Sequence, residues 1–270
     1  MRFVCPKCKE KLNIDDKRCF CSSGHSFDRA RGGYYNLLLG ASGGVHGDNR
    51  EMVLARRAFL DGGYYSKLVE LLSRLVLDVT PVLGSLLDAG AGEGYYTDHI
   101  ERALFKRDGA TDVSAFDISK DAVREIVRKN PRISAVVAGS YHMPIADESF
   151  DTLINTFSPL ALEETRRVLK SGGHFIMAIP AEMHLFDLKS VIYEIPYKNV
   201  VEDSCLDGFE LISDVPLSYK FTLHGREEIN NLFMMTPYAY RTRPEDRRKA
   251  EMLEHLECTA DFRVFVYRKL

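Results

Sequence analysis

Long apolar segments are missing from this sequence. There is no run of about 18 apolar residues, the length a helix needs to span a bilayer, so we expect no membrane segment. The first ten residues, MRFVCPKCKE, also lack the apolar stretch of about 7–15 residues that a secretory signal requires. Internal repeats and low-complexity tracts are absent as well. These absences predict a cytoplasmic protein, whose thiols stay reduced and bind metal more readily than they form disulfides.

A strong overall charge is also missing, since the net charge is −3 over 270 residues. This argues against a protein that coats nucleic acid, but the charge is unevenly distributed. Residues 1–35 contain eight Lys and Arg against four Asp and Glu, and this segment stays positive when three thiolates and a zinc ion are added. We therefore predict a basic head on an acidic body.

The chain pattern predicts an α/β protein with a small N-terminal unit. GASGGVHGDN (40–49) has almost no apolar side chains and is typical of a flexible linker. A helical pattern over 50–78 is interrupted at Gly62 and Gly63. Beyond Pro81, short apolar runs alternate with helical segments, which predicts a parallel sheet; the runs are 85–89, 112–117, 132–138, 151–156 and 174–179, and the helices 95–107, 119–129 and 160–170. Two longer strands, 209–223 and 260–270, flank a last helical region.

Cysteine is scarce except at the N-terminus, where four of the six cysteines fall. The spacing Cys5-x2-Cys8, twelve residues, Cys21-x3-His25 supplies two pairs of ligands of the kind that share one tetrahedral zinc ion. Because about 30 residues cannot bury enough apolar area to fold alone, the metal would organise this unit. With all four positions filled by protein, the zinc is structural.

Alternatives to this ligand set remain open at the sequence level. Cys19 could replace Cys21, although Cys19-x-Cys21 leaves too little room for both to bind one ion. The cluster could also consist of incidental surface cysteines. Cys205 and Cys258 lie far from the cluster in sequence and are expected to be buried core residues.

A glycine-rich turn follows the first predicted strand of the sheet. In LLDAGAGEGYYT, Gly90, Gly92 and Gly94 form G-x-G-x-G between a strand and a helix, where glycine lets the backbone approach a ligand. The spacing differs from the dinucleotide fingerprint G-x-G-x-x-G. Asp88 and Glu93 would repel phosphate and suit a cationic ligand. The next strand ends in Asp117, a position suited to binding ribose hydroxyls.

This arrangement resembles the class I S-adenosylmethionine (SAM) methyltransferases. The resemblance rests on D-x-G-x-G-x-G, the acid Asp117, Ser140 after the third strand, and the stretches MPIADESFD and LKSGGHFIMAIP. It implies a Rossmann-like, mostly parallel seven-stranded sheet, with SAM as the cofactor and a zinc-ribbon-like domain ahead of it. The alternative is a doubly wound fold that has lost its cofactor.

The whole chain resembles one family more closely, the RlmA-type 23S rRNA (guanine-N1) methyltransferases. The likeness includes C-P-x-C…C-x3-H, YYNLL (34–38), ARRAFLDGGYY (55–65), AGEGYYT, the His184-Leu185 segment and MMTPYAYRTRPE (234–245). It implies a zinc-binding, RNA-recognising domain over 1–35, a flexible linker over 36–49 and a SAM-dependent methyltransferase domain over 50–270.

Residue roles follow from the resemblance. It places the zinc ligands on Cys5, Cys8, Cys21 and His25. It places SAM contacts on Tyr65, Gly92, Glu93 and His184, to which the general motif adds Asp88, Gly90, Gly94 and Asp117. The Tyr65 ring could lie over the sulfonium in a cation–π contact. Without the resemblance, Tyr65 is equally well interpreted as a packing residue, and His184 is more often an ordinary surface or hydrogen-bonded histidine than a ligand-binding one.

The segment after the fourth strand departs from a known pattern. It reads N-T-F-S-P (155–159), not the N/D-P-P-Y/F of methyltransferases that modify exocyclic amino groups. This fits attack by a ring nitrogen and leaves the residue that accepts the guanine N1 proton unidentified, with Glu93 and His184 as the candidates.

The predicted reaction is transfer of a methyl group from SAM to N1 of a guanine in 23S rRNA. The family implies a target in hairpin 35, at position 745 or 748, a link to macrolide resistance in one subfamily, and a homodimer. Phosphates could be held by the basic head and by an arginine group that could equally form a solvated helix face, Arg241, Arg243, Arg247 and Arg248. Two rival hypotheses are a small-molecule SAM methyltransferase and a non-enzymatic, zinc-dependent RNA-binding factor.

Overall fold

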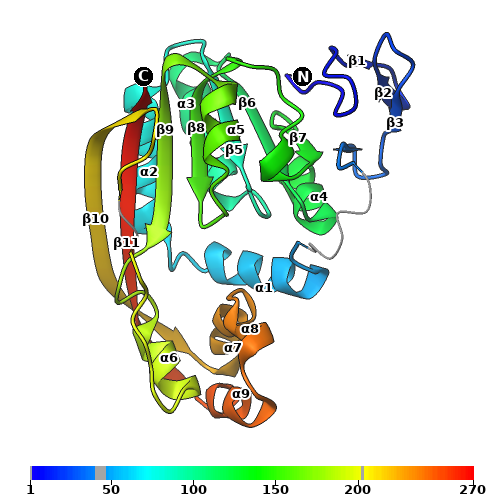
Figure 1. Ribbon diagram of the computed structural model, residues 1–270. Coiled ribbons are helices and arrows are strands. Elements are labelled where there is room, and N and C mark those ends of the chain that lie inside the picture. Colours follow the sequence, from blue (N-terminus) through cyan, green and yellow to red (C-terminus); the bar gives the residue numbers. More distant parts are fainter. Residues whose placement is uncertain (1, 40–46, 202–203) are drawn as a thin grey trace.

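The strands of the described residues form two sheets. The computed structural model describes residues 2–39, 47–201 and 204–270. The smaller sheet is antiparallel and consists of β1 (Asn13–Ile14), β2 (Arg18–Phe20) and β3 (Ser26–Asp28). It lies beside β7 and α4, at one edge of the larger sheet (Figure 1). A small antiparallel sheet joined to a large mixed sheet confirms the predicted combination of a zinc-ribbon-like domain with an α/β domain.

The larger sheet has the strand order β10-β11-β9-β8-β5-β6-β7-β4. From β4 to β9 neighbouring strands run parallel, whereas β11 is antiparallel to both β9 and β10. Seven of these strands form the predicted Rossmann-like sheet, and β4 extends it by a short edge strand. The bounds are β4 (Tyr35–Asn36), β5 (Ser85–Ala89), β6 (Asp112–Asp117), β7 (Ser134–Val137), β8 (Phe150–Thr156), β9 (Leu169–Pro180), β10 (Phe209–His224) and β11 (His255–Lys269).

The helices agree with the periodicity of the sequence in most places. The interruption at Gly62 and Gly63 separates two helices, and Gly63 has a φ of +80°, which suits glycine. The predicted helix over 160–170 is shorter, because the chain turns extended at Leu169 and begins β9 there. The bounds are α1 (Arg50–Asp61), α2 (Ser66–Val79), α3 (Tyr95–Asp108), α4 (Lys120–Lys129), α5 (Leu162–Val168), α6 (Phe186–Ile192), α7 (Arg226–Met234), α8 (Tyr238–Arg241) and α9 (Pro244–Glu251), with a 3-10 turn at Ser140–His142.

The N-terminal unit packs directly against the larger sheet. The backbone of Phe3 forms a β-bridge with Ile145, and the Val4 amide donates to the Pro144 carbonyl at 2.8 Å. The Phe3 side chain is 1% exposed and belongs to the same apolar cluster as residues of the larger sheet. The metal-binding unit and the α/β domain therefore share a core.

The predicted boundary at residue 35 and the predicted linker over 36–49 remain predictions. Tyr35 and Asn36 form β4, and the Leu37 amide donates to the Val137 carbonyl at 2.9 Å. The chain is thus attached to β7 at the start of the expected linker, whereas residues 40–46 of that linker lie outside the described residues. Within the part of the chain that the structure describes, no helix combines the length and apolar character needed to cross a membrane.

Candidate functional site: a metal cluster and a glycine loop

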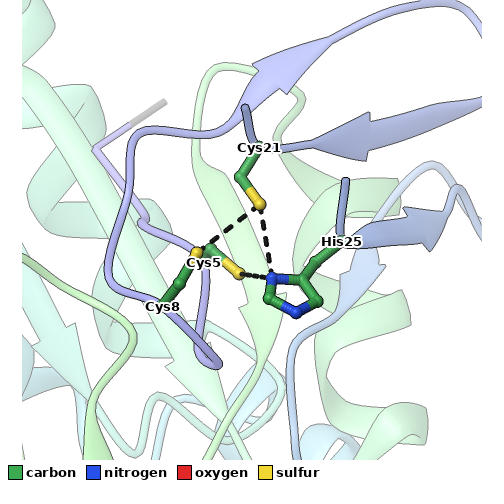
Figure 2. A group of neighbouring side chains, drawn as sticks. All are labelled: Cys5, Cys8, Cys21 and His25. Atoms are coloured by element: carbon green, nitrogen blue, oxygen red, sulfur yellow. Dashed lines mark hydrogen bonds between the residues drawn. The ribbon is translucent and has the colours of Figure 1, made fainter. Parts of the chain in front are cut away.

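Four predicted zinc ligands meet at one end of the smaller sheet. The ligand atoms of Cys5, Cys8, Cys21 and His25 all lie within 4.8 Å of one another. Figure 2 shows these side chains pointing toward one another. Cys5 Sγ and Cys21 Sγ each lie 3.5 Å from His25 Nδ1, and Cys8 Sγ lies 3.5 Å from Cys21 Sγ. A tetrahedron with Zn–S near 2.3 Å and Zn–N near 2.0 Å has edges of about 3.5–3.8 Å. The observed spacing and the donor set fit zinc.

Local backbone geometry explains why these residues converge. The Gly24 amide donates to the Cys21 carbonyl at 3.1 Å, and Gly24 adopts a φ of +83°, which turns the chain between Cys21 and His25. Cys19, the alternative ligand, belongs to β2 and is fully buried outside the cluster. Burial raises the pKa of its thiol to about 11, so it remains protonated.

The glycine loop connects β5 to α3 as predicted, and its three glycines all have positive φ. A Cβ at Gly90 would lie 2.0 Å from Ser158 Oγ, and one at Gly94 would lie 2.8 Å from Ile126 Cγ1. These two positions therefore require glycine for packing as well as for conformation. At Gly92 the nearest heavy atom would be 3.7 Å away. That atom is Nη1 of Arg56, so Gly92 needs glycine for its conformation and not for packing.

Three carboxyl groups surround this loop, as the sequence predicted. The Gly92 amide donates to Asp117 Oδ2 at 2.9 Å, and Thr97 Oγ1 donates to Asp88 Oδ2 at 2.6 Å. Asp88 is 1% exposed and Glu93 is 4% exposed. Burial raises the pKa of Asp88 to about 7, with smaller contributions from the charges of Asp117 and Glu93. Burial likewise raises the pKa of Glu93 to about 7, against the opposing charge of Arg56.

These groups suit a cationic ligand. Asp88 Oδ1 is buried and has no hydrogen-bond partner among the described residues. An orphaned carboxylate oxygen next to two other acids repels phosphate and stabilises positive charge. SAM carries positive charge on its sulfur and on its amino group, so the residues present fit SAM and do not fit a pyrophosphate.

Tyr65 and His184, distant in sequence, lie in contact. Tyr65 Oη is 3.3 Å from His184 Nε2, and Tyr65 is 2% exposed. The Tyr65 ring packs edge-on against Phe59 and Phe262, each with centroids 5.0 Å apart. Tyr65 thus has the packing role that the sequence left open, and its contact with SAM remains a proposal.

Arg56 is a site residue that the sequence analysis missed. It comes from α1, forms an ion pair with Asp48 and donates to the Met235 carbonyl at 3.2 Å. Its charge also lowers the pKa of Glu93. The only signal in the sequence was an arginine among the apolar residues of α1. The partners of Arg56 could not be predicted, because residues 48 and 235 lie far apart in the sequence.

The C-terminal arginines were predicted either to hold phosphates or to form a solvated helix face, and two of them differ in their surroundings. Arg247 is paired with Glu251 at 2.6 Å and its guanidinium lies over the Phe233 ring, so it is engaged within the protein. Arg243 is 79% exposed, with Glu245 at 3.7 Å, and is accessible to a ligand.

The fold and the two sites define a class I SAM-dependent methyltransferase with an N-terminal zinc ribbon. Residues 87–177 match the family described as "Methyltransferase domain", and residues 3–39 match the family described as "RlmA, N-terminal".

Relatives cover nearly the whole chain. The 23S rRNA (guanine(748)-N(1))-methyltransferase of Streptomyces fradiae is 30% identical, over 98% of this chain and 96% of its own. A protein of Micromonospora griseorubida, provisionally named as a 23S rRNA (guanine-N(1)-)-methyltransferase, is 32% identical over 98% of this chain and 97% of its own. The chain belongs to the RlmA-type family of 23S rRNA (guanine-N1) methyltransferases.

Among solved structures, the YcgJ protein of Bacillus subtilis aligns with a TM-score of 0.47 and 13% identity, over 74% of this chain and 97% of that chain.

Proposed function

We propose that the protein transfers a methyl group from SAM to N1 of a guanine in 23S rRNA. The observation that carries this proposal is the joining of a zinc ribbon to an acid-lined glycine loop, in a chain similar to a guanine-748 methyltransferase along nearly its full length. Position 748 in hairpin 35 is therefore the first target to test, with 745 as the alternative.

The residues of the glycine loop hold the cofactor in this proposal. SAM supplies a methyl group on a positively charged sulfur that already carries its leaving group. Asp88, Glu93 and Asp117 provide the negative charge that favours this cation, while Gly90, Gly92 and Gly94 shape the loop. Tyr65 and His184 form the proposed aromatic side of the site. Because Asp88, Glu93 and Tyr65 are almost fully buried, they limit the access of water and fix orientation, which is most of what a displacement of this kind requires.

Glu93 is the better of the two candidates for accepting the guanine N1 proton. The Asp261 amide donates to His184 Nδ1 at 3.3 Å, so we assign the ring proton to Nε2, which faces Tyr65 Oη. Both ring nitrogens are thereby engaged, and burial lowers the pKa of His184 to about 3, with a further contribution from the charge of Lys189. The Glu93 pKa of about 7 suits a general base near neutral pH.

The ribbon is the proposed RNA-recognising part. Cys5, Cys8, Cys21 and His25 bind a structural zinc ion there, with no position left for a substrate ligand. Lys and Arg side chains of this basic unit and the exposed Arg243 would contact phosphates. Guanine N1 lies on the Watson–Crick edge, so the base must be unpaired or flipped outward, which favours a hairpin loop.

Purified protein and methyl-labelled SAM test this function. We expect label to enter a 23S rRNA fragment containing hairpin 35, and nuclease digestion to recover it as N1-methylguanosine. Labelling of small acceptors but not of RNA would favour the small-molecule hypothesis. Failure to bind SAM in calorimetry would favour a non-enzymatic RNA-binding factor.

The oligomeric state and cellular location belong to the same proposal. We expect a cytoplasmic homodimer in which two ribbons flank one RNA groove. Light scattering coupled to gel filtration should give twice the mass of the chain, and a monomer active on rRNA would contradict this arrangement.

A further inference from the structure

The loop that follows β8 lies directly against the glycine loop. In the stretch N-T-F-S-P (155–159), Asn155 and Thr156 are the last residues of β8, and the loop begins at Phe157. The side-chain Nδ2 of Asn155 donates to the Ala89 carbonyl at 3.3 Å and to the Pro159 carbonyl at 3.4 Å, which attaches the loop to the end of β5. Ser158 Oγ occupies the space next to Gly90 that a Cβ would need. Asn155 is thus a structural residue of β8, and it holds the loop at the edge of the proposed cofactor site.

Phe157, the first residue of this loop, combines two unusual features. Its φ is +57°, a left-handed conformation that bulky L-residues rarely adopt. Its side chain is 41% exposed, although the Tyr96 and Phe262 rings next to it are buried. The Phe157 amide donates to the Ala178 carbonyl of β9 at 3.1 Å, which holds this backbone in place. The fold therefore maintains a strained conformation that keeps an aromatic ring accessible at the edge of the site.

Aromatic rings of the proposed cofactor site support Phe157. Its ring lies nearly parallel to the His184 ring, at 20° with centroids 6.3 Å apart. The Phe262 ring lies 5.5 Å away, and the Tyr96 ring meets Phe157 edge-on at 6.3 Å. These contacts fix the ring while leaving part of it open to solvent. A fixed, accessible aromatic ring is a surface on which a nucleobase can stack.

Tyr96 is an independent indication of a ligand at this place. Its side chain is 8% exposed, and its hydroxyl is buried without a hydrogen-bond partner among the described residues. Burial, with contributions from Tyr65 and Glu93, raises the pKa of Tyr96 well above its ordinary value, so the hydroxyl remains protonated and able to donate. A buried hydroxyl without a partner costs stability, which a ligand that supplies the partner would recover.

We propose that Phe157 is the platform on which the target guanine stacks, and that the Tyr96 hydroxyl hydrogen-bonds to the polar edge of that base. This inference rests on the proposed function and names the residues that would position its substrate. It assigns a role to Phe157 and Tyr96 that is distinct from holding the cofactor.

Steady-state kinetics on a hairpin 35 fragment test the platform. Stacking of one base is worth about 1–3 kcal/mol, so we expect Phe157→Ala to lower kcat/KM for RNA roughly 5- to 150-fold. Phe157→Tyr should retain the wild-type value within about threefold, since it keeps the ring. Phe157→Leu should lose as much as Phe157→Ala, which separates aromatic stacking from bulk. Phe157→Asn, which tolerates the left-handed conformation, should show the same loss in a folded protein.

Two further measurements separate the outcomes. In calorimetry, the SAM dissociation constants of Phe157→Ala and Tyr96→Phe should each stay within about twofold of the wild-type value. In RNA kinetics, Tyr96→Phe should lower kcat/KM about 2- to 12-fold, the usual range for the loss of one hydrogen bond. Phe105→Ala is the matched control. Phe105 is a phenylalanine of similar exposure (49%, against 41% for Phe157), it lies near the C-terminal end of α3, far from Tyr96, and its replacement should leave activity unchanged.

Equal activity of Phe157→Ala and wild type on RNA would overturn this inference and leave the proposed function intact. A loss of SAM affinity as large as the loss of RNA methylation would also overturn it, by making Phe157 a cofactor contact. Wild-type protein that methylates no rRNA would instead refute the proposed function, and the inference with it.

Discussion

At the residue scale, burial of the carboxyl groups around the glycine loop opposes folding and favours the binding of a cation. The pKa of Asp88 is about 7 in the folded protein, compared with an ordinary value of 3.8. The folded state therefore holds a proton that the unfolded chain has already lost. The stability contributed by this proton is fully present below about pH 4 and is lost as the pH rises through about 7. A bound cation would compensate for that loss.

Asp88→Asn tests this trade-off. The variant should be more stable than wild type at pH 8, by up to about 4 kcal/mol, and the difference should shrink toward pH 4. SAM should also raise its melting temperature less than that of wild type, because the amide carries no charge. Urea denaturation at several pH values, with and without SAM, measures both effects. A difference in stability that is the same at all pH values would contradict the role given to burial.

Glu93→Gln tests the proton acceptor. As a base, Glu93 must be deprotonated, so wild-type kcat/KM for RNA should fall as the pH drops below about 7. The glutamine variant should lose this pH dependence and roughly 100-fold in rate, a usual contribution of general base catalysis. If kcat/KM of the glutamine variant still falls as the pH drops below about 7 (the acidic limb of the profile), another group is the base. His184→Gln should retain that limb.

At the element scale, α1 connects three parts of the site. Arg56 on this helix pairs with Asp48, donates to the Met235 carbonyl after α7 and lowers the pKa of Glu93. The helix itself was predictable from its apolar periodicity. Its role was not, because hydrophobic patterning identifies the buried face of a helix and says nothing about which distant carbonyl will meet a side chain.

Arg56→Gln should have two effects. We expect about 2 kcal/mol of lost stability from the broken ion pair and hydrogen bond. The acidic limb of the pH–kcat/KM profile should move to higher pH, because Glu93 loses a neighbouring positive charge. The adjacent Arg57→Gln is the control. Arg57 forms surface pairs with Asp61 and Glu125, worth less than about 1 kcal/mol, and the variant should leave the pH profile in place. Identical profiles for the two variants would contradict the role of Arg56.

The ribbon is an element that depends on its metal. Cys8→Ser or a strong chelator should remove the zinc and lower the melting temperature of the whole protein, since Phe3 and its neighbours share a core with the larger sheet. RNA methylation should be abolished, whereas some SAM binding should persist in the larger domain. Cys205→Ser should retain zinc and activity, because Cys205 lies outside the cluster and is exposed; the prediction that it is a buried core residue was wrong, whereas Cys258 is buried as predicted. Normal methylation by zinc-free protein would show that the ribbon does not recognise RNA.

The sequence predicted the elements whose signals are local. The spacing of Cys5, Cys8, Cys21 and His25 predicted the metal cluster. The pattern Gly90-x-Gly92-x-Gly94 predicted the turn between β5 and α3. Other features required tertiary contacts. The position of Phe157 depends on the end of β5 and on β9, and the packing of the ribbon depends on residues 144 and 145, so neither could be deduced from spacing.

At the scale of the whole molecule, the ribbon and the methyltransferase domain form one connected core. Figure 1 shows the ribbon beside β7 and α4, while α6 to α9 lie at the opposite end of the molecule. The backbone contacts of Val4 and Leu37 attach the ribbon before and after its metal site. An RNA contacting both the ribbon and the cofactor loop would thus meet a preformed surface, which favours recognition of one folded hairpin.

The most direct test of the account is mass spectrometry of 23S rRNA from cells with and without this gene. We predict that one guanine of hairpin 35 carries an additional methyl group in the parent strain and lacks it in the deletion strain, and that the methyl group returns when the gene is restored. An unchanged hairpin 35 in the deletion strain would contradict the central claim, that this chain methylates a guanine of 23S rRNA.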